Sequence, residues 1–137
     1  LAALEQTEPA GNDYMTDASV LHARKYRCRR ILARYAEQRP HPALPMELHV
    51  IRLGDIAFAT NPFELFLDFG LRMTARSPAL QTFLVQLTAG GIPSYLATAK
   101  AAAGESYSAC LYCNEVGPEG GQQLVEETVS TLNALWS

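Results

Sequence analysis

The chain has 137 residues, of which 48% are hydrophobic and 18% charged, and its formal net charge is −3. A chain of this size and composition can bury an ordinary hydrophobic core, which excludes a disordered tail, a collagen-like fibre and a disulfide-stabilised mini-protein. No apolar run approaches the ~18 residues that a membrane span requires, so we expect no transmembrane segment. The small negative charge gives no general attraction to nucleic acid or to anionic lipid.

The first part of the chain predicts a flexible lead-in followed by a helix. Residues 1–13 are polar and are interrupted by a proline and a glycine. Over residues 17–38 apolar positions recur at intervals of three and four, which is the helical period, and Pro40 ends the pattern. We expect 1–13 to be a lead-in and 14–137 to form a single domain. Because the chain begins at Leu1 without an initiator methionine, we interpret it as a processed or excised piece of something longer.

Two strands and a second helix are predicted next. Residues 47–53 alternate as a half-buried strand does, and residues 56–60 form a more apolar strand. The intervening Gly54-Asp55 favours a hairpin. The run Asn61-Pro62-Phe63-Glu64 has the features of a helix start, with Asn as N-cap, Pro in the first turn and Glu at the third position. We expect this helix to continue to about residue 75.

The second half of the chain continues the alternation of strands and helices. Residues 81–87 form the clearest strand of the sequence, and 88–106 form a long irregular loop of the kind that usually carries function. Residues 108–113 are interpreted as a last strand. The turn at 117–121 precedes a closing helix with one apolar stripe, over 124–136. This order predicts an α/β fold with a mixed β-sheet flanked by helices.

Basic residues are concentrated in the first long helix. A nucleic-acid patch is one interpretation, because neutralising phosphates requires clustered Lys and Arg. The basic positions surround the apolar stripe on most sides, so we favour a solvated face or one docked on an acidic neighbour, and expect no nucleic-acid partner. Seven of the eleven basic residues lie here: Arg24, Lys25, Arg27, Arg29, Arg30, Arg34 and Arg39.

The cysteines and histidines give no convincing metal or redox site. Cys110 and Cys113 have the spacing of such a pair, but they fall in strand-like sequence and no second pair would complete a zinc site. We expect them to be buried structural thiols. The three histidines are scattered and form no cluster of metal ligands.

Glu64 has two interpretations. As the third residue of a helix it would close a capping box with Asn61, and from the sequence alone this structural role is favoured. The same position lies just past a buried strand, where α/β folds tend to place ligands. There the helix dipole would keep the carboxylate ionised, as a cation site requires.

Tyr95 and Tyr107 lie in or beside the irregular loop, twelve residues apart. A phenol can pack in a core, donate a hydrogen bond to a developing oxyanion, or bind a metal whose charge lowers its pKa. Taken singly, each tyrosine is more often a packing residue.

The order of segments resembles the neutral/alkaline (non-lysosomal) ceramidase family, and most closely its bacterial ceramidase-like members. The resemblance is carried by Asn61-Pro62-Phe63-Glu64-Leu65-Phe66, by the strand over 81–87, by the loop around Tyr95 and by Val116-Gly117-Pro118-Glu119-Gly120-Gly121. It covers about residues 46–136. This region corresponds to the C-terminal part of the family's zinc-dependent catalytic domain.

The resemblance implies roles for three residues. Glu64 and Tyr95 would be zinc ligands, and Tyr107 would be the catalytic residue that contacts the amide carbonyl. The family's two zinc-binding histidines lie in the N-terminal half of the domain, which would be a required partner. The implied activity is zinc-dependent hydrolysis of the amide bond of an N-acyl lipid such as ceramide, or of another amide.

Two consequences are expected of this chain. By itself it would bind zinc weakly or not at all and would be inactive, because it would carry only half of the zinc site. The alternative function is a non-catalytic α/β interaction or structural domain, with Glu64 as a helix cap and the tyrosines in the core.

Overall fold

The structure is a computed structural model that describes residues 1–9, 14–88, 92 and 94–137. The chain divides into two compact units, 1–44 and 45–137, and each is described by itself. The boundary expected at residue 13 stays a prediction. Over the described ranges, no helix combines the length and the apolar character needed to cross a bilayer.

The first unit is a short helix held against a long one. Helix α1 spans Ala2–Glu5 and helix α2 spans Tyr14–Glu37, which confirms the helix expected over 17–38. The Arg29 guanidinium donates to Glu5 Oε1 over 2.6 and 2.9 Å, and Lys25 Nζ donates to the backbone oxygen of Thr7 over 3.3 Å. Lys25 and Arg29, two of the basic residues of α2, therefore have hydrogen-bond partners within the first unit.

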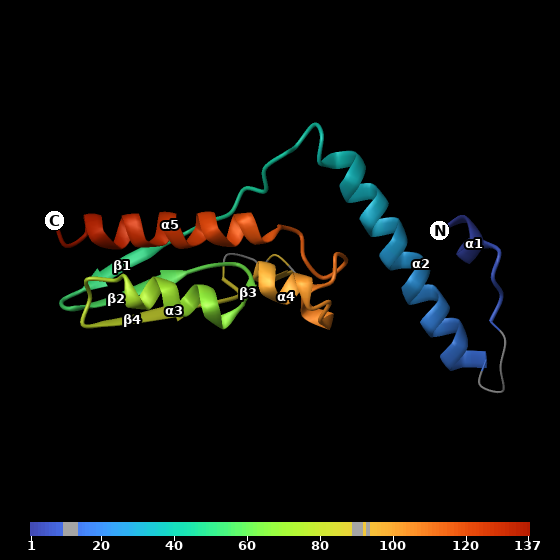
Figure 1. Ribbon diagram of the computed structural model, residues 1–137, viewed down its shortest axis with the longest axis horizontal. Coiled ribbons are helices and arrows are strands. Elements are labelled where there is room, and N and C mark those ends of the chain that lie inside the picture. Colours follow the sequence, from blue (N-terminus) through green and yellow to red (C-terminus); the bar gives the residue numbers. More distant parts are fainter. Residues whose placement is uncertain (10–13, 89–91, 93) are drawn as a thin grey trace. The chain divides into compact units, whose positions relative to one another are not determined.

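The second unit is built on a three-stranded mixed sheet. Strand β1 (Val50–Leu53) and strand β2 (Ile56–Thr60) form the expected hairpin, with Gly54 at φ +60° in the turn. Strand β4 (Gln81–Val85) pairs with β2 in parallel, so the order is β1-β2-β4. Helix α3 (Leu67–Ala75) lies in the connection from β2 to β4 (Figure 1). The α/β fold with a mixed sheet is confirmed.

Two helices cover one face of this sheet. Helix α5 spans Pro118–Ala134, packs beside α3 and contacts β1, while α3 contacts β4. Ala57 and Ala59 of β2 are buried beneath them, whereas Ile51 and Phe83, on the other face, are 55% and 45% exposed. The apolar stripe expected on the closing helix is largely confirmed by its buried residues: Gly121, Leu124, Val125, Thr128, Val129 and Leu132.

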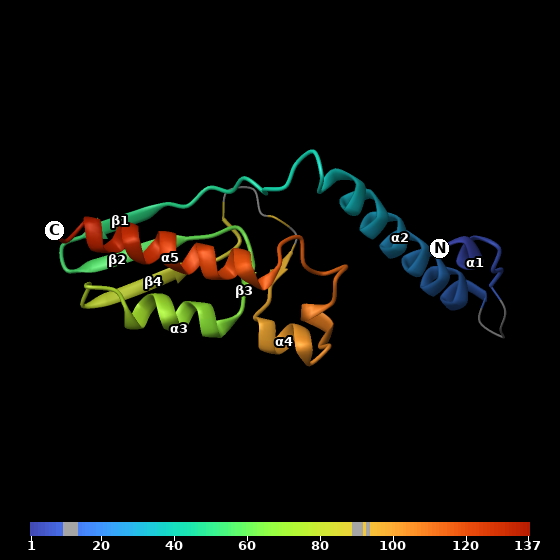
Figure 2. The ribbon, with the colours of Figure 1, turned by 45° about the horizontal axis from the view of Figure 1, so that its top comes forward.

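A second, two-stranded sheet lies beyond the end of the first. Strand β3 (Glu64–Leu65) pairs in parallel with strand β5 (Tyr95–Leu96). Helix α4 (Ala99–Ala103) and the 3₁₀ helix η1 (Tyr107–Ala109) follow. In both ribbon views β3 and α4 lie near the N-terminal end of α5 (Figure 2).

The helix start expected at residues 61–64 is wrong, because α3 begins only at Leu67. The backbone amides here bind groups far along the chain: the amide of Asn61 donates to the oxygen of Val85, and that of Glu64 to the oxygen of Ser94. The side chain of Asn61 accepts from the amide of Phe63 rather than capping a helix. Glu64 is therefore a strand residue, and neither the capping-box interpretation nor the helix-dipole argument applies to it.

The strand expected over 108–113 is also wrong. This segment contains η1 and a turn in which the amide of Cys113 donates to the oxygen of Cys110. Both cysteines are free and half-buried rather than buried.

Close packing of α3 on α5 generates a stability prediction. A β-carbon at residue 121 would lie 2.7 Å from Cε2 of the Phe69 ring, in a buried contact. We expect Gly121→Ala to lower the free energy of unfolding by about 1–3 kcal/mol, although alanine is the better helix former. Urea denaturation measures the change. Gly104→Ala is the control, because the nearest atom there is 3.5 Å away, and an equal loss in both variants would contradict the packing argument.

Candidate functional site

The candidate site is set by the pairing of two short strands. In the parallel register Glu64 stands opposite Tyr95, and Leu65 stands opposite Leu96. The amide of Glu64 donates to the oxygen of Ser94 over 3.1 Å. Because successive strand residues point to opposite faces, the buried leucines place Glu64 and Tyr95 together on the other face.

The carboxylate of Glu64 affects the titration of the Tyr95 phenol. Hydrogen bonding to Glu64 is the largest cause of a Tyr95 pKa above its ordinary value. The negative charge of Glu64 adds to the effect, followed by partial burial and the neighbouring Tyr107 and Cys113. A phenol beside a carboxylate keeps its proton more firmly, because ionisation would place two negative charges together.

Tyr107 completes a cluster with these two residues. Its ring meets the Tyr95 ring edge-on, with 6.5 Å between centroids and 75° between planes. Tyr107 is 63% exposed, so its phenol remains accessible to solvent or to a ligand. The structure therefore brings Glu64, Tyr95 and Tyr107 to one place, although 42 residues of the sequence separate Glu64 from Tyr107.

Two further side chains at this site were not anticipated from the sequence. The ring of Tyr112 packs edge-on against Tyr107 at 6.3 Å. Gln86 accepts a hydrogen bond from the amide of Leu65 over 2.7 Å and so links β3 to the segment after β4. Both residues lie in segments whose sequence pattern predicted only strands, and no local signal marks their contacts.

The chemistry of Glu64 and Tyr95 fits part of a zinc site. Zinc accepts carboxylate oxygen, and a phenol becomes a ligand when the metal's charge lowers its pKa. The register places the two residues opposite one another, but the phenol proton must leave before both oxygens can bind a cation. Apart from the undescribed residues, the chain contains no group of three or more His, Cys, Asp and Glu side chains that could hold a metal.

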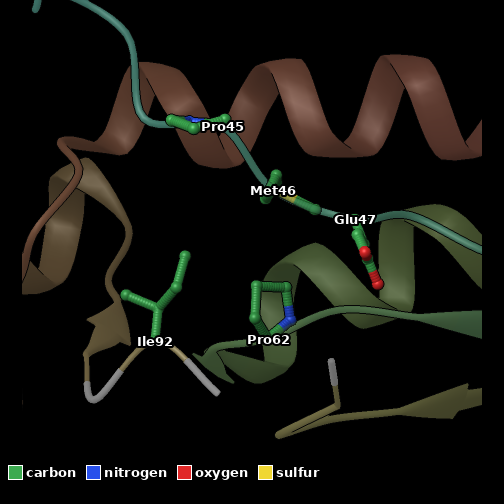
Figure 3. A pocket seen from close by; sticks show the side chains of 5 residues that line it. All are labelled: Pro45, Met46, Glu47, Pro62 and Ile92. Atoms are coloured by element: carbon green, nitrogen blue, oxygen red, sulfur yellow. The ribbon is translucent and has the colours of Figure 1, made fainter. Parts of the chain in front are cut away.

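A pocket of about 270 Å³ lies elsewhere on the second unit (Figure 3). Among the described residues, its walls are largely apolar and come from the segment before β1, from the β2–β3 connection and from the segment before β5. They are Pro45, Met46, Glu47, Pro62 and Ile92. Glu64, Tyr95 and Tyr107 are not among these lining residues.

Comparisons with protein-family profiles, curated proteins and solved structures gave no match. The resemblance to ceramidases therefore stays a prediction that rests on the residues quoted for it.

The Tyr95–Glu64 contact generates a pH prediction. Because the pKa of Tyr95 is raised, the stabilisation from this contact is complete below about pH 10, the ordinary value for tyrosine, and is lost as the pH rises through the higher folded-state pKa. We expect Glu64→Gln to lower the Tyr95 pKa, because it removes the charge and leaves a weaker acceptor. Residue-resolved NMR titration of the phenol carbons measures this.

The matched control for this titration is Glu127→Gln, which removes the same charge from the exposed side of α5. It should leave the Tyr95 titration unchanged. A Tyr95 titration that is identical in wild type and Glu64→Gln would show that the two side chains do not interact in solution.

Proposed function

We propose that residues 45–137 carry the C-terminal part of the active site of a zinc-dependent amidohydrolase. The proposal is supported by one observation above others: Glu64 and Tyr95, which the ceramidase resemblance assigns as zinc ligands, are opposite one another in the β3–β5 register, and Glu64 raises the pKa of the Tyr95 phenol. The 30 residues that lie between them in the sequence gave no local reason to expect this pairing. Tyr107, the proposed catalytic residue, lies against the same phenol.

The proposed roles follow from the chemistry of each side chain. Glu64 and Tyr95 hold the metal through their oxygens, and both are fixed by a backbone anchored in the core. Bound zinc supplies a Lewis acid that polarises an amide carbonyl. Tyr107 donates its phenol proton in a hydrogen bond to the carbonyl oxygen as that oxygen gains negative charge.

The proposal includes a partner. Zinc sites of hydrolases use three protein ligands or more, and two oxygens leave the ion too open to offset its dehydration. The resemblance assigns the missing ligands to two histidines in the N-terminal half of the domain. We propose that this chain is active only when joined to that half, and that its substrate is an N-acyl lipid such as ceramide, or another amide.

The non-catalytic interaction or structural domain stays the alternative proposal. Two details expected with it differ: Glu64 is an exposed strand residue whose amide pairs with Ser94, not a helix cap. The alternative also placed the tyrosines in the core, but Tyr107 is 63% exposed.

Zinc binding by the chain alone should be weak and should depend on pH. Because the cation replaces the Tyr95 proton, we expect the apparent affinity to rise about tenfold per pH unit while the phenol is protonated. Isothermal titration calorimetry in two buffers of different ionisation enthalpy counts the released proton. Tyr95→Phe should abolish that release, while Glu127→Gln should preserve it. Zinc affinity that is independent of pH would contradict the assignment of Tyr95 as a ligand.

Hydrolysis should depend on Tyr107 in the protein that joins this chain to its histidine-bearing half. We expect Tyr107→Phe to lower kcat for a ceramide substrate by about 10²–10³-fold, as removal of an oxyanion donor does elsewhere. Tyr112→Phe is the matched control, because this neighbouring ring packs on Tyr107 without an assigned role in the reaction. Equal rates for Tyr107→Phe and wild type would refute the catalytic role.

A further inference from the structure

Tyr107 lies in a segment with little regular structure of its own. The 3₁₀ helix η1 has only three residues, Tyr107–Ala109, and no side chain caps its start. A helix this short does not hold its own position, because its few internal hydrogen bonds are poorly aligned. The placement of the Tyr107 phenol must therefore come from contacts outside η1.

The side chain of Asn114 supplies such contacts in two directions. Its Oδ1 accepts a hydrogen bond from the amide of Ala97, directly after β5, over 3.2 Å. Its Nδ2 donates to the backbone oxygen of Ser108 over 2.8 Å and to that of Cys110 over 3.0 Å. One carboxamide thus joins the end of β5 to the turn that carries Tyr107.

The backbone on both sides of Asn114 is itself fixed to β5. The amide of Tyr95 donates to the oxygen of Cys113 over 3.0 Å, and the amide of Glu115 donates to Ser94 Oγ over 2.7 Å. Ser94 is buried, and its hydroxyl in turn donates to the oxygen of Tyr95 over 2.8 Å. Asn114 therefore stands on a rigid base, so its Nδ2 bonds position η1 relative to Tyr95.

We propose that Asn114 is a positioning residue for Tyr107, holding its phenol beside the Glu64–Tyr95 pair through the hydrogen bonds to Ser108 and Cys110. The positioning is a property of this chain alone. Its contribution to amide hydrolysis rests on the proposed function.

Asparagine suits this position because one side chain must both accept and donate. The carboxamide provides one acceptor oxygen and two N–H donors, and all three are used here. An aspartate of the same shape would still accept from Ala97. It would turn a second oxygen toward the Ser108 and Cys110 carbonyls, where a donor is required. Asn114→Asp therefore removes the bonds to Ser108 and Cys110 and keeps the bond from Ala97.

The first test uses the isolated chain and the nuclear Overhauser effect between the ring protons of Tyr95 and Tyr107. We expect Asn114→Asp to remove this effect while the amide of Ala97 keeps its protection from hydrogen exchange. Asn133→Asp is the matched control, because Asn133 also donates through Nδ2 to a backbone oxygen, that of Val129, but within α5. An unchanged ring-to-ring effect in folded Asn114→Asp would overturn the proposal.

A second variant covers the case in which Asn114→Asp does not fold. Asn114→Ser adds no charge, and its shorter side chain cannot reach both Ala97 and the turn. We expect it to fold and to lose the ring-to-ring effect. If both variants unfold while Asn133→Asp stays folded, Asn114 maintains the whole unit rather than the place of Tyr107, and the proposal is overturned.

The second test is a double-mutant cycle in the protein joined to its histidine-bearing half. Because Asn114 acts through Tyr107, Asn114→Asp should lower kcat in the wild type and have no further effect in Tyr107→Phe. Additive losses would overturn the proposal. A wild-type protein without amidase activity would refute the proposed function instead, and the ring-to-ring measurement would still decide the role of Asn114.

Discussion

The parallel pairing of β3 with β5 is the constraint on which the rest of the site depends. Two strands of only two residues each bring Glu64 opposite Tyr95 and bury Leu65 beside Leu96. The amide of Tyr95 and the hydroxyl of Ser94 also form hydrogen bonds with the segment that ends at Glu115. Without this pairing, nothing would fix the positions of the carboxylate, the two phenols and the turn of Tyr107 relative to one another.

The parts of the fold that were predicted correctly are those whose signal is local. Helix α2, the β1–β2 hairpin, strand β4 and helix α5 each show their own hydrophobic period or turn residues within a short window. The segment 61–66 was misjudged because its capping pattern is also local, whereas its amides bind Val85, Ser94 and Leu96. Long-range hydrogen bonds of this kind leave no trace in spacing and override helix propensity.

The residues of the candidate site likewise divide into those that could be predicted from the sequence and those that could not. Glu64, Tyr95 and Tyr107 were identified by chemistry and by the ceramidase resemblance, and the structure brings them together. Asn114 and Gln86 escaped notice, because a carboxamide is unremarkable in sequence and becomes informative only when its partners are known. Residues that bear chemistry can be recognised by type, whereas those that orient them are recognised by contact.

The alternation of exposed and buried residues along β3 and β5 has a consequence for how the site moves. A ladder this short would fray readily at a protein surface. Here separating the strands would also hydrate Leu65 and Leu96, each costing about 1.5–3 kcal/mol. Glu64 and Tyr95 can therefore separate only when the hydrophobic core also opens. Their pairing persists as long as the folded unit does, which is longer than a contact within a surface loop.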